Sequence, residues 1–426
     1  MKKALAGKRP FFYGWWIVLC CFMLLFLFAG AGFYSFSIFI KPLESTFGWR
    51  RSEISLAMSI YLIVHGSMAP LIGYLVEKYG PRRIMSFFVV IFGGAFILVS
   101  RTDSLLFFYL TYALIAVGSS GVGFVPVSSI LSRWFVRRRG TAIGVSMVGI
   151  SLGGMVMAPL IEFLNTSYSW RVAFVFLGIV VWVIGLPLTM FVIKGNPRDM
   201  ALLPDGDLPE AVPEDSPVDS SALPGNVAET GWPLNAALRS RAFWSVVATF
   251  ILAPAAQMGV LQHQVPLITG VGISGAVAAA ALGFTAGLGG VGKMSFGRIS
   301  ELIPLQFVAL LCFGLQAISV LVLYYASSMV SVWIYVFIFG FAMGGNIVLL
   351  PIVVGRYFGL ASFGVLMGIV TFFQALGSGA GAVLSGVIYD TTGSYQVALM
   401  LYTGIYLLAI LAIFSAGQPK AYQPAT

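Results

Sequence analysis

Long apolar runs, separated by short polar segments, follow one another along almost the whole chain. A run of about 20 apolar residues is the length that an α-helix needs to cross the hydrocarbon core of a bilayer. The pattern predicts an all-α integral membrane protein with twelve transmembrane helices. The expected spans are 13–40, 54–77, 84–100, 105–130, 140–163, 171–193, 242–265, 274–297, 305–326, 330–355, 362–388 and 395–415.

The second half of the chain repeats features of the first. The segment from Gly73 to Glu77 recurs 224 residues later as Gly297 to Glu301. Pro42-Leu43 recurs as Pro266-Leu267, and the segment from Arg133 to Phe135 is echoed by Arg356 to Phe358. With about six spans in each copy, the repeat predicts two pseudosymmetric six-helix bundles. Secondary transporters with such repeats bind their substrate between the halves, near the middle of the membrane.

Composition and charge agree with this assignment. Hydrophobic residues make up 59% of the chain and charged residues only 9%. Most Lys and Arg residues fall in one alternating set of loops, and the exceptions are Lys41, Arg50, Arg51, Arg101 and Arg171. Since cytoplasmic loops carry the excess of basic residues, both termini are expected in the cytoplasm and the protein in the cytoplasmic membrane. The net charge of +9 then reflects topology and contact with anionic lipid, and no nucleic-acid partner is expected.

Three regions are expected: an N-terminal bundle (1–193), a linker (194–241), and a C-terminal bundle with a short tail (242–426). The linker holds several prolines and eight of the fifteen acidic residues in the chain. Such a composition buries too little apolar surface to fold by itself, so a flexible cytoplasmic linker is expected. A docking site for a partner protein is the alternative.

The segment from Gly73 to Arg83 resembles the signature between helices 2 and 3 of the major facilitator superfamily, with Glu77 in the usual aspartate position. Within that superfamily, three further motifs resemble monocarboxylate transporters and oxalate/formate antiporters. These motifs are Gly14-Trp15-Trp16, Trp134 to Gly140, and Asp390 to Tyr395. The resemblance spans nearly the whole chain and implies the major facilitator fold and transport of a small organic anion.

The repeated segments are expected to form a latch at the cytoplasmic ends of the bundles. Gly73 and Gly297 permit close helix contact, and Glu77 lies at a helix end near basic residues. The latch is predicted to comprise Gly73, Glu77, Arg82, Arg83, Gly297, Arg298 and Glu301. The second copy lacks the following basic pair, so its latch is expected to be weaker. The alternative is that these charges only set topology and loop solubility.

Lys293 is the main candidate for substrate chemistry. It precedes Gly297 by four residues, about 6 Å along a helix, and a cation at such depth needs a wet cavity or a counter-ion. Glycines at 287, 289, 290 and 292 leave room beside it, although close helix packing would also explain them. The alternative is that Lys293 extends to the inner surface beside Glu301.

The resemblance bears on this position. Lys293 occupies the place of a substrate-binding arginine in monocarboxylate and oxalate carriers. Gly289 replaces an aspartate of the human-type carriers, and the second lysine of oxalate carriers is missing, so a monovalent anion is expected. Burial favours the neutral amine and a bound carboxylate favours the ammonium. Lys293 is therefore predicted to take up proton and anion together.

Other polar residues within the spans are weaker candidates. They are expected to orient the substrate or, alternatively, to form interhelical hydrogen bonds: Tyr34, Tyr112, Ser119, Gln257, Asn346 and Gln374. His65 is a second candidate for proton coupling, with packing as its alternative role. His263 is interpreted as an outer gate or a solvated helix end.

The predicted function is secondary active transport of a small organic anion, a monocarboxylate, by alternating access and with proton symport. No spacing of His, Cys and carboxylates suits a metal, a cofactor or an enzyme site, and a functional monomer is expected. The alternatives are an exporter of drug-like or neutral solutes, a transporter-derived sensor without flux, and, least favoured, a channel.

Overall fold

The computed structural model describes residues 12–49, 51–200, 202–206, 231–270, 272–273 and 275–417, and these residues are almost entirely helical. The first half comprises α1 (Gly14–Ala29), the π-helix η1 (Gly30–Tyr34), α2 (Phe36–Phe47), α3 (Arg51–Tyr79), α4 (Pro81–Val99), α5 (Leu105–Ser120), α6 (Phe124–Trp134), α7 (Arg139–Ser167), α8 (Trp170–Pro187) and the π-helix η2 (Leu188–Val192). The second half comprises α10 (Arg241–Gln262), α11 (Gln264–Gly270), α12 (Gly275–Leu302), α13 (Leu305–Tyr324), α14 (Met329–Phe358), α15 (Phe363–Thr392) and α16 (Gln396–Ala416).

Eleven helices within the described residues are long and apolar enough to cross a membrane. They correspond to eleven of the twelve expected spans. The twelfth, predicted at 274–297, coincides with α12, which is not among the eleven. The count of twelve spans therefore stays a prediction, although α12 packs beside the other helices of its bundle.

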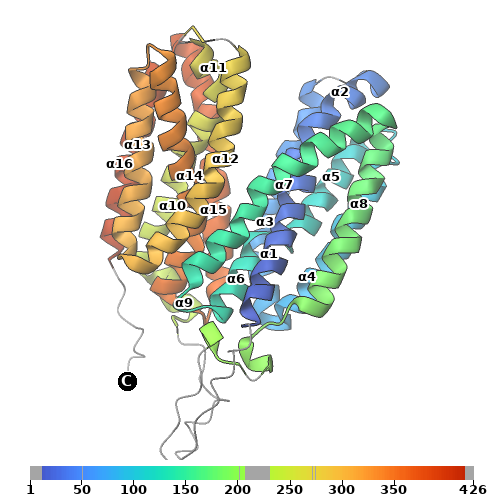
Figure 1. The fold of residues 1–426 in the computed structure, drawn as a ribbon, viewed down its shortest axis with the longest axis vertical. Helices are drawn as coiled ribbons and strands as arrows, with labels where there is room; N and C mark the ends of the chain where they lie inside the picture. Colours follow the sequence, from blue (N-terminus) through green and yellow to red (C-terminus); the bar gives the residue numbers. More distant parts are fainter. Residues whose placement is uncertain are drawn as a thin grey trace, which may run out of the picture.

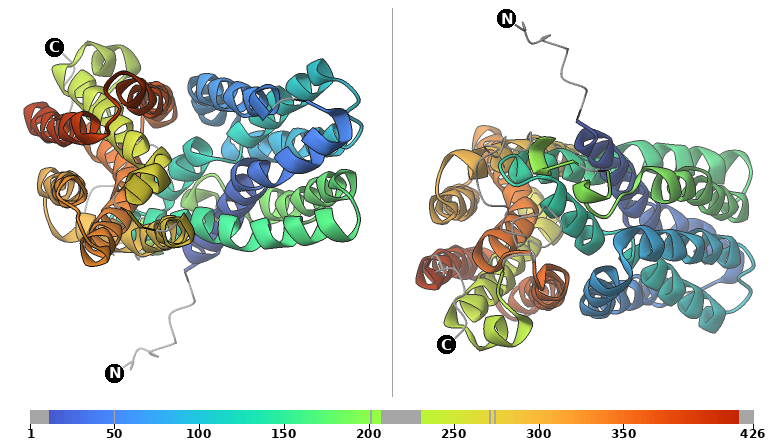
Figure 2. Two further views of the ribbon diagram at one scale, coloured as in Figure 1. Left: turned by 90° about the horizontal axis from the view of Figure 1, so that it is seen from above. Right: turned by 90° about the horizontal axis from the view of Figure 1, so that it is seen from below.

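The helices form two bundles, one from each half of the chain (Figure 1). Seen along the bundles, the two halves lie side by side (Figure 2). Their helices converge at the end where the linker elements η3 (Pro197–Met200), η4 (Pro204–Gly206) and α9 (Leu234–Arg239) lie, and they diverge toward the opposite end (Figure 1). These two ends are called the linker end and the open end below.

Helix boundaries follow from local chemistry. The side chains of Ser104, Ser169, Ser240 and Ser328 each accept a hydrogen bond from a first-turn amide, at the starts of α5, α8, α10 and α14. Such N-caps satisfy amides that have no partner within the helix. The fourth expected span is divided into α5 and α6 at residues 121–123, and Pro126 in the first turn of α6 supplies no amide hydrogen.

Glycines bring the two bundles into contact along two helix pairs, α3 with α15 and α7 with α12. A Cβ on Gly73 would overlap the carbonyl group of Gly364, and a Cβ on Gly140 would overlap that of Gly297. Both pairs join the two halves of the chain. The bundles therefore meet with backbone against backbone at these points, which only glycine permits.

The described parts of the linker lie on the bundles. The amide of Trp232 donates to the carbonyl oxygen of Phe358 at 2.8 Å, and Gly231 pairs with Gly359 as an isolated β-bridge. The other end of the linker carries Asp205, which contacts the N-terminal bundle as described below. Most of the predicted flexible segment, residues 201 and 207–230, lies outside the described residues.

A side chain at the glycine contacts should force the bundles apart at the linker end. We expect Gly73→Val and Gly140→Val to make this end more accessible, because each new side chain would occupy the position of backbone atoms in the other bundle. The measurement is the labelling rate, with a membrane-permeant thiol reagent, of a cysteine placed at Ala142. Gly283→Val is the matched control, because nothing lies within 4 Å of a Cβ there. Unchanged labelling in both test variants would show that these contacts do not close the linker end.

Candidate functional site

Glu77 of α3 caps a helix of the other bundle. Its Oε1 accepts hydrogen bonds from the amides of Gly364 at 2.5 Å and Val365 at 3.3 Å, in the first turn of α15. The side chain of Ser362, the N-cap residue, makes no capping bond. A carboxylate at a helix N-terminus satisfies free amides and interacts favourably with the helix dipole. Glu77 thus connects the two bundles at the linker end.

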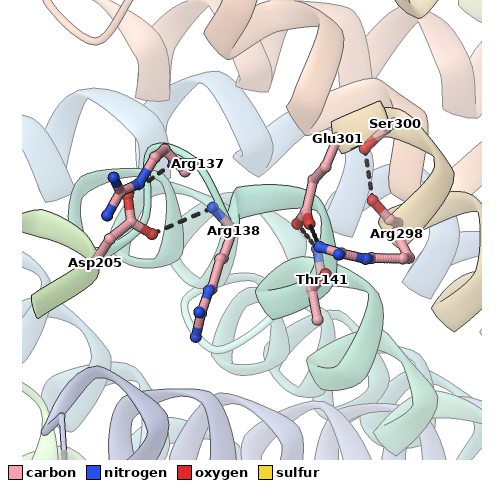
Figure 3. A network of polar contacts seen from close by, with 8 residues as sticks. Arg137, Arg138, Thr141, Asp205, Arg298, Ser300 and Glu301 are labelled. Carbon is pink, nitrogen blue, oxygen red and sulfur yellow. Dashed lines mark hydrogen bonds and ion pairs between the residues drawn. The ribbon is translucent and has the colours of Figure 1, made fainter. Parts of the chain in front are cut away.

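Glu301 of α12 makes the reciprocal contact. Its Oε1 accepts a hydrogen bond from the amide of Thr141 at 2.6 Å, in the first turn of α7, and its Oε2 pairs with Arg298 at 2.6 Å (Figure 3). Glu301 lies 224 residues after Glu77, and Gly364 lies 223 residues after Thr141. The internal repeat therefore places one carboxylate from each half on a helix end of the other half. The second copy, expected to be weaker, makes a contact of the same kind.

Arg82 and Arg83 have a different place from the two carboxylates. Both are exposed, and they line a pocket at the start of α4 together with Lys194 and Asp199. The capping bonds of Glu77 go to backbone amides in the opposite bundle. The predicted latch residues therefore divide into two groups, and Glu77 and Glu301 are the ones that bridge the bundles.

The linker contributes a third carboxylate to this end. Asp205 accepts hydrogen bonds from three consecutive amides, those of Val136, Arg137 and Arg138, at 3.0, 2.8 and 3.2 Å (Figure 3). Asp205 has a positive φ of 59°, a conformation that few residues other than glycine adopt. The loop that leads into α7 is thus held by the linker, three residues before the amide that Glu301 caps.

Lys293 of α12 points across the boundary between the bundles. Its Nζ donates a hydrogen bond to Oγ of Ser151 in α7 at 2.7 Å, and the side chain is only 6% exposed. Within the described residues no carboxylate forms an ion pair with it. The amine therefore does not extend to the surface beside Glu301, the alternative that the sequence left open.

The glycines near Lys293 serve two purposes. Gly292 packs against the carbonyl of Phe341, and a Cβ there would overlap it, so close packing accounts for this position. Gly290 faces Ser151 at 3.7 Å from a built Cβ, and nothing lies within 4 Å of such an atom on Gly287. The space beside the amine is thus left by Gly287 and Gly290.

Asn346 and Gln257 bond to each other. The Nδ2 of Asn346 in α14 donates to Oε1 of Gln257 in α10 at 2.7 Å. Asn346 is 3% exposed, and its Oδ1 has no hydrogen-bond partner within the described residues. The pair joins two helices and still leaves one acceptor for a ligand, so both roles considered for it remain.

The other predicted residues are dispersed. Tyr34 in η1 is 37% exposed and its ring lies on Gly154 of α7, whereas Gln374 is half-buried on α15. Tyr112 is 3% exposed and packs among Phe36 and Phe108, which is an aromatic core position.

The remaining polar candidates differ in how fully they are bonded. Ser119 is buried and donates to the carbonyl oxygen of Ala116 at 3.0 Å. His65 stacks with Tyr61, and its Nε2 lacks a hydrogen-bond partner within the described residues. Both ring nitrogens of His263 have partners, Tyr395 Oη at 3.0 Å and Ala382 O at 3.1 Å, so the position interpreted as a gate is a bonded one.

Four residues of the site escaped the sequence analysis: Ser151, Thr141, Gly364 and Tyr61. For Thr141 and Gly364 the signal was present, because the repeat that relates Glu77 to Glu301 also relates their partners. Ser151 has no such signal, since a serine in an apolar span is most often bonded within its own helix.

Comparisons with known proteins agree with the fold and the site. The family model described as Major Facilitator Superfamily matches residues 20–381. Monocarboxylate transporter 13 of Bos taurus is 25% identical over 93% of this chain and 87% of its own length. Monocarboxylate transporter 2 of Rattus norvegicus is 26% identical over 96% of this chain and 87% of its own.

Solved structures show the same fold. The transporter FucP in the outward conformation has a TM-score of 0.72 at 13% identity, covering 94% of this chain and 98% of its own. The human organic anion transporter MFSD10 (TETRAN) has a TM-score of 0.64 at 16% identity, covering 94% and 97%.

Removing the charge of either bridging carboxylate should loosen the linker end. We expect Glu77→Gln and Glu301→Gln each to shift the equilibrium toward separated ends about five-fold, since a charge at a helix terminus contributes about 1 kcal/mol. The double variant should show roughly the sum of the two free-energy changes. Distance distributions between spin labels on the two bundles at the linker end measure the shift.

Glu162→Gln is the control for this experiment, because Glu162 is an exposed carboxylate on α7 outside the linker end. Distances that stay the same in both test variants would contradict a bridging role for these carboxylates.

Proposed function

Because the chain belongs to the Major Facilitator Superfamily, we propose that it carries a small monocarboxylate across the cytoplasmic membrane together with a proton, by alternating access. The family makes it a membrane transporter, and its relatives over nearly the full length are named monocarboxylate transporters. The substrate, the coupling ion and the direction are the proposal.

One observation carries the proposal, namely the place of Lys293. A lone amine, 6% exposed, lies on the boundary between the bundles with a hydroxyl as its hydrogen-bond partner. A buried cation without a carboxylate is costly in a membrane protein, and an anionic ligand relieves that cost. A small carboxylate also fits the space left by Gly287 and Gly290.

Proton coupling follows from the chemistry of a buried amine. Without a ligand, its apolar surroundings favour the neutral amine, whereas a bound carboxylate favours the ammonium. One proton and one anion then enter together and leave together, so no net charge moves. Lysine suits this role better than arginine, whose guanidinium does not release its proton in proteins.

Ser151 connects this chemistry to movement of the bundles. Its hydroxyl belongs to α7 of the N-terminal bundle and accepts the hydrogen bond of Lys293 from the C-terminal bundle. A carboxylate that binds the ammonium competes with this hydroxyl, and the link between the bundles then changes. Rocking about this site would also separate Glu77 from α15 and Glu301 from α7, opening the linker end.

Substitutions at Lys293 test the proposal directly. We expect Lys293→Gln to lower uptake of labelled monocarboxylates by proteoliposomes at least ten-fold, because the ligand loses its counter-charge. Lys293→Arg should retain binding but lose the stimulation of uptake by an inward proton gradient. Full uptake with an intact gradient response in Lys293→Gln would refute the assignment, as an exporter of neutral solutes would not need the amine.

Substitutions at Ser151 test how the amine is held. Removing a hydrogen bond to the ammonium makes protonation harder, so in Ser151→Ala the half-maximal rate of uptake should occur at lower external pH than in the wild type. Ser151→Thr keeps the hydroxyl and serves as the control, with the wild-type profile expected. Initial rates measured across a pH series give the comparison, and identical profiles for all three proteins would exclude this role of Ser151.

A further inference from the structure

Two irregular segments of transmembrane helices meet at one place in the N-terminal bundle. The first helix changes from α1 to the π-helix η1 at Gly30, and the fourth span is interrupted between the end of α5 at Ser120 and the start of α6 at Phe124. Segments of π-helix and interrupted helices recur at binding sites, because they free backbone groups and redirect side chains. The residues between them therefore merit a functional explanation.

Tyr61 and His65 of α3 lie between these segments. Their rings stack with centroids 5.8 Å apart and planes 19° from parallel, and Phe28 of α1 packs against the imidazole. Tyr61 is 1% exposed. Its hydroxyl and Nε2 of His65 are both buried and lack a hydrogen-bond partner in the part of the chain that the structure describes. Leaving such groups unsatisfied costs about 1 to 3 kcal/mol each.

Glycines from both irregular segments border these two groups. A Cβ on Gly32 of η1 would lie 3.1 Å from the Tyr61 hydroxyl, and a Cβ on Gly123 would lie 3.4 Å from His65 Nε2. Ser119 of α5 lies beside Tyr61, but its own hydroxyl donates to Ala116. The chain thus has no side chain at the two positions closest to the orphaned polar atoms.

The N-terminus of α6 adds further hydrogen-bond donors. Gly123 is its N-cap residue and provides no side-chain cap, so the first amides of the helix stand at its positive end. Gly123 lies next to His65 Nε2, which places this helix end at the same site. The tyrosine hydroxyl, an imidazole N–H and helix amides together favour an oxygen that accepts hydrogen bonds.

The site lies at the boundary between the bundles. Gly66, the neighbour of His65, faces Ala375 of α15 in the C-terminal bundle, with a built Cβ 3.2 Å from the alanine side chain. His65 itself is only half-buried, so the site is not sealed inside the N-terminal bundle. A molecule between the two halves can therefore reach it.

We propose that Tyr61, His65 and the start of α6 form a second subsite, which binds an uncharged oxygen of the transported acid while Lys293 binds its carboxylate. The inference rests on the proposed function and extends it to the substrate class. A subsite of neutral donors selects acids with a keto or hydroxyl oxygen over acids with a plain hydrocarbon chain. His65 then acts as a donor to the substrate and not as a proton carrier.

The test compares two three-carbon acids that differ at the second carbon, pyruvate and propionate, in proteoliposomes. The wild type should have the lower KM for pyruvate. In Tyr61→Phe and in His65→Phe the KM for pyruvate should rise about five-fold, which corresponds to one hydrogen bond of about 1 kcal/mol, while the KM for propionate stays the same. Phenylalanine keeps the stacked rings in both variants and removes only the polar atoms.

Tyr109→Phe is the matched control, because it removes from the same bundle a tyrosine hydroxyl that donates to the carbonyl oxygen of Glu53. It should leave the ratio of the two KM values unchanged. If Tyr61→Phe and His65→Phe weaken both acids equally, the groups serve packing or bind only water, and the inference is overturned while the proposed function stands.

Lys293→Gln separates the two proposals, since it should impair both acids together. If the wild type neither takes up nor is thermally stabilised by either acid, the proposed function is wrong, and the subsite inference fails with it.

Discussion

The free amides at the start of a helix must find a partner, and here two helices find it in the opposite half of the molecule. Glu77 caps α15 and Glu301 caps α7, so each bundle completes a helix of the other. The contacts depend on glycines, because only the approach of α3 to α15 and of α7 to α12 brings the carboxylates within reach. The closed linker end, the divergence at the open end and the position of Lys293 between the bundles all follow from this arrangement (Figure 1).

The same helix pair carries the latch and the candidate substrate charge. Lys293 lies two turns before Glu301 on α12, and both reach α7, one through Ser151 and the other through Thr141. A change in the bonding of the amine is therefore transmitted along one rigid helix to the latch. A coupling of this kind needs only two packings of α7 against α12 that differ in free energy by a few kcal/mol.

The sequence predicted the helical bundles, because runs of apolar residues and an internal repeat are sufficient to define them. It also identified Glu77, Glu301 and Lys293, since charges in or beside apolar spans are conspicuous. It could not identify their partners: Glu77 bonds to backbone amides, which have no sequence signature, and Ser151 is one of many serines in the spans. Nor did it assign Tyr112 to an aromatic core, because a polar hydroxyl on a cavity-lining helix looks the same in either role.

The central claim is that one buried amine takes up the anion and the proton together, so that transport moves no net charge. The most direct measurement records current from proteoliposomes on a solid-supported membrane after a jump in carboxylate concentration, while a fluorescent dye reports proton entry. The account predicts acidification of the lumen without a sustained current. A current that scales with uptake would contradict it, because proton and anion would then not enter as a neutral pair.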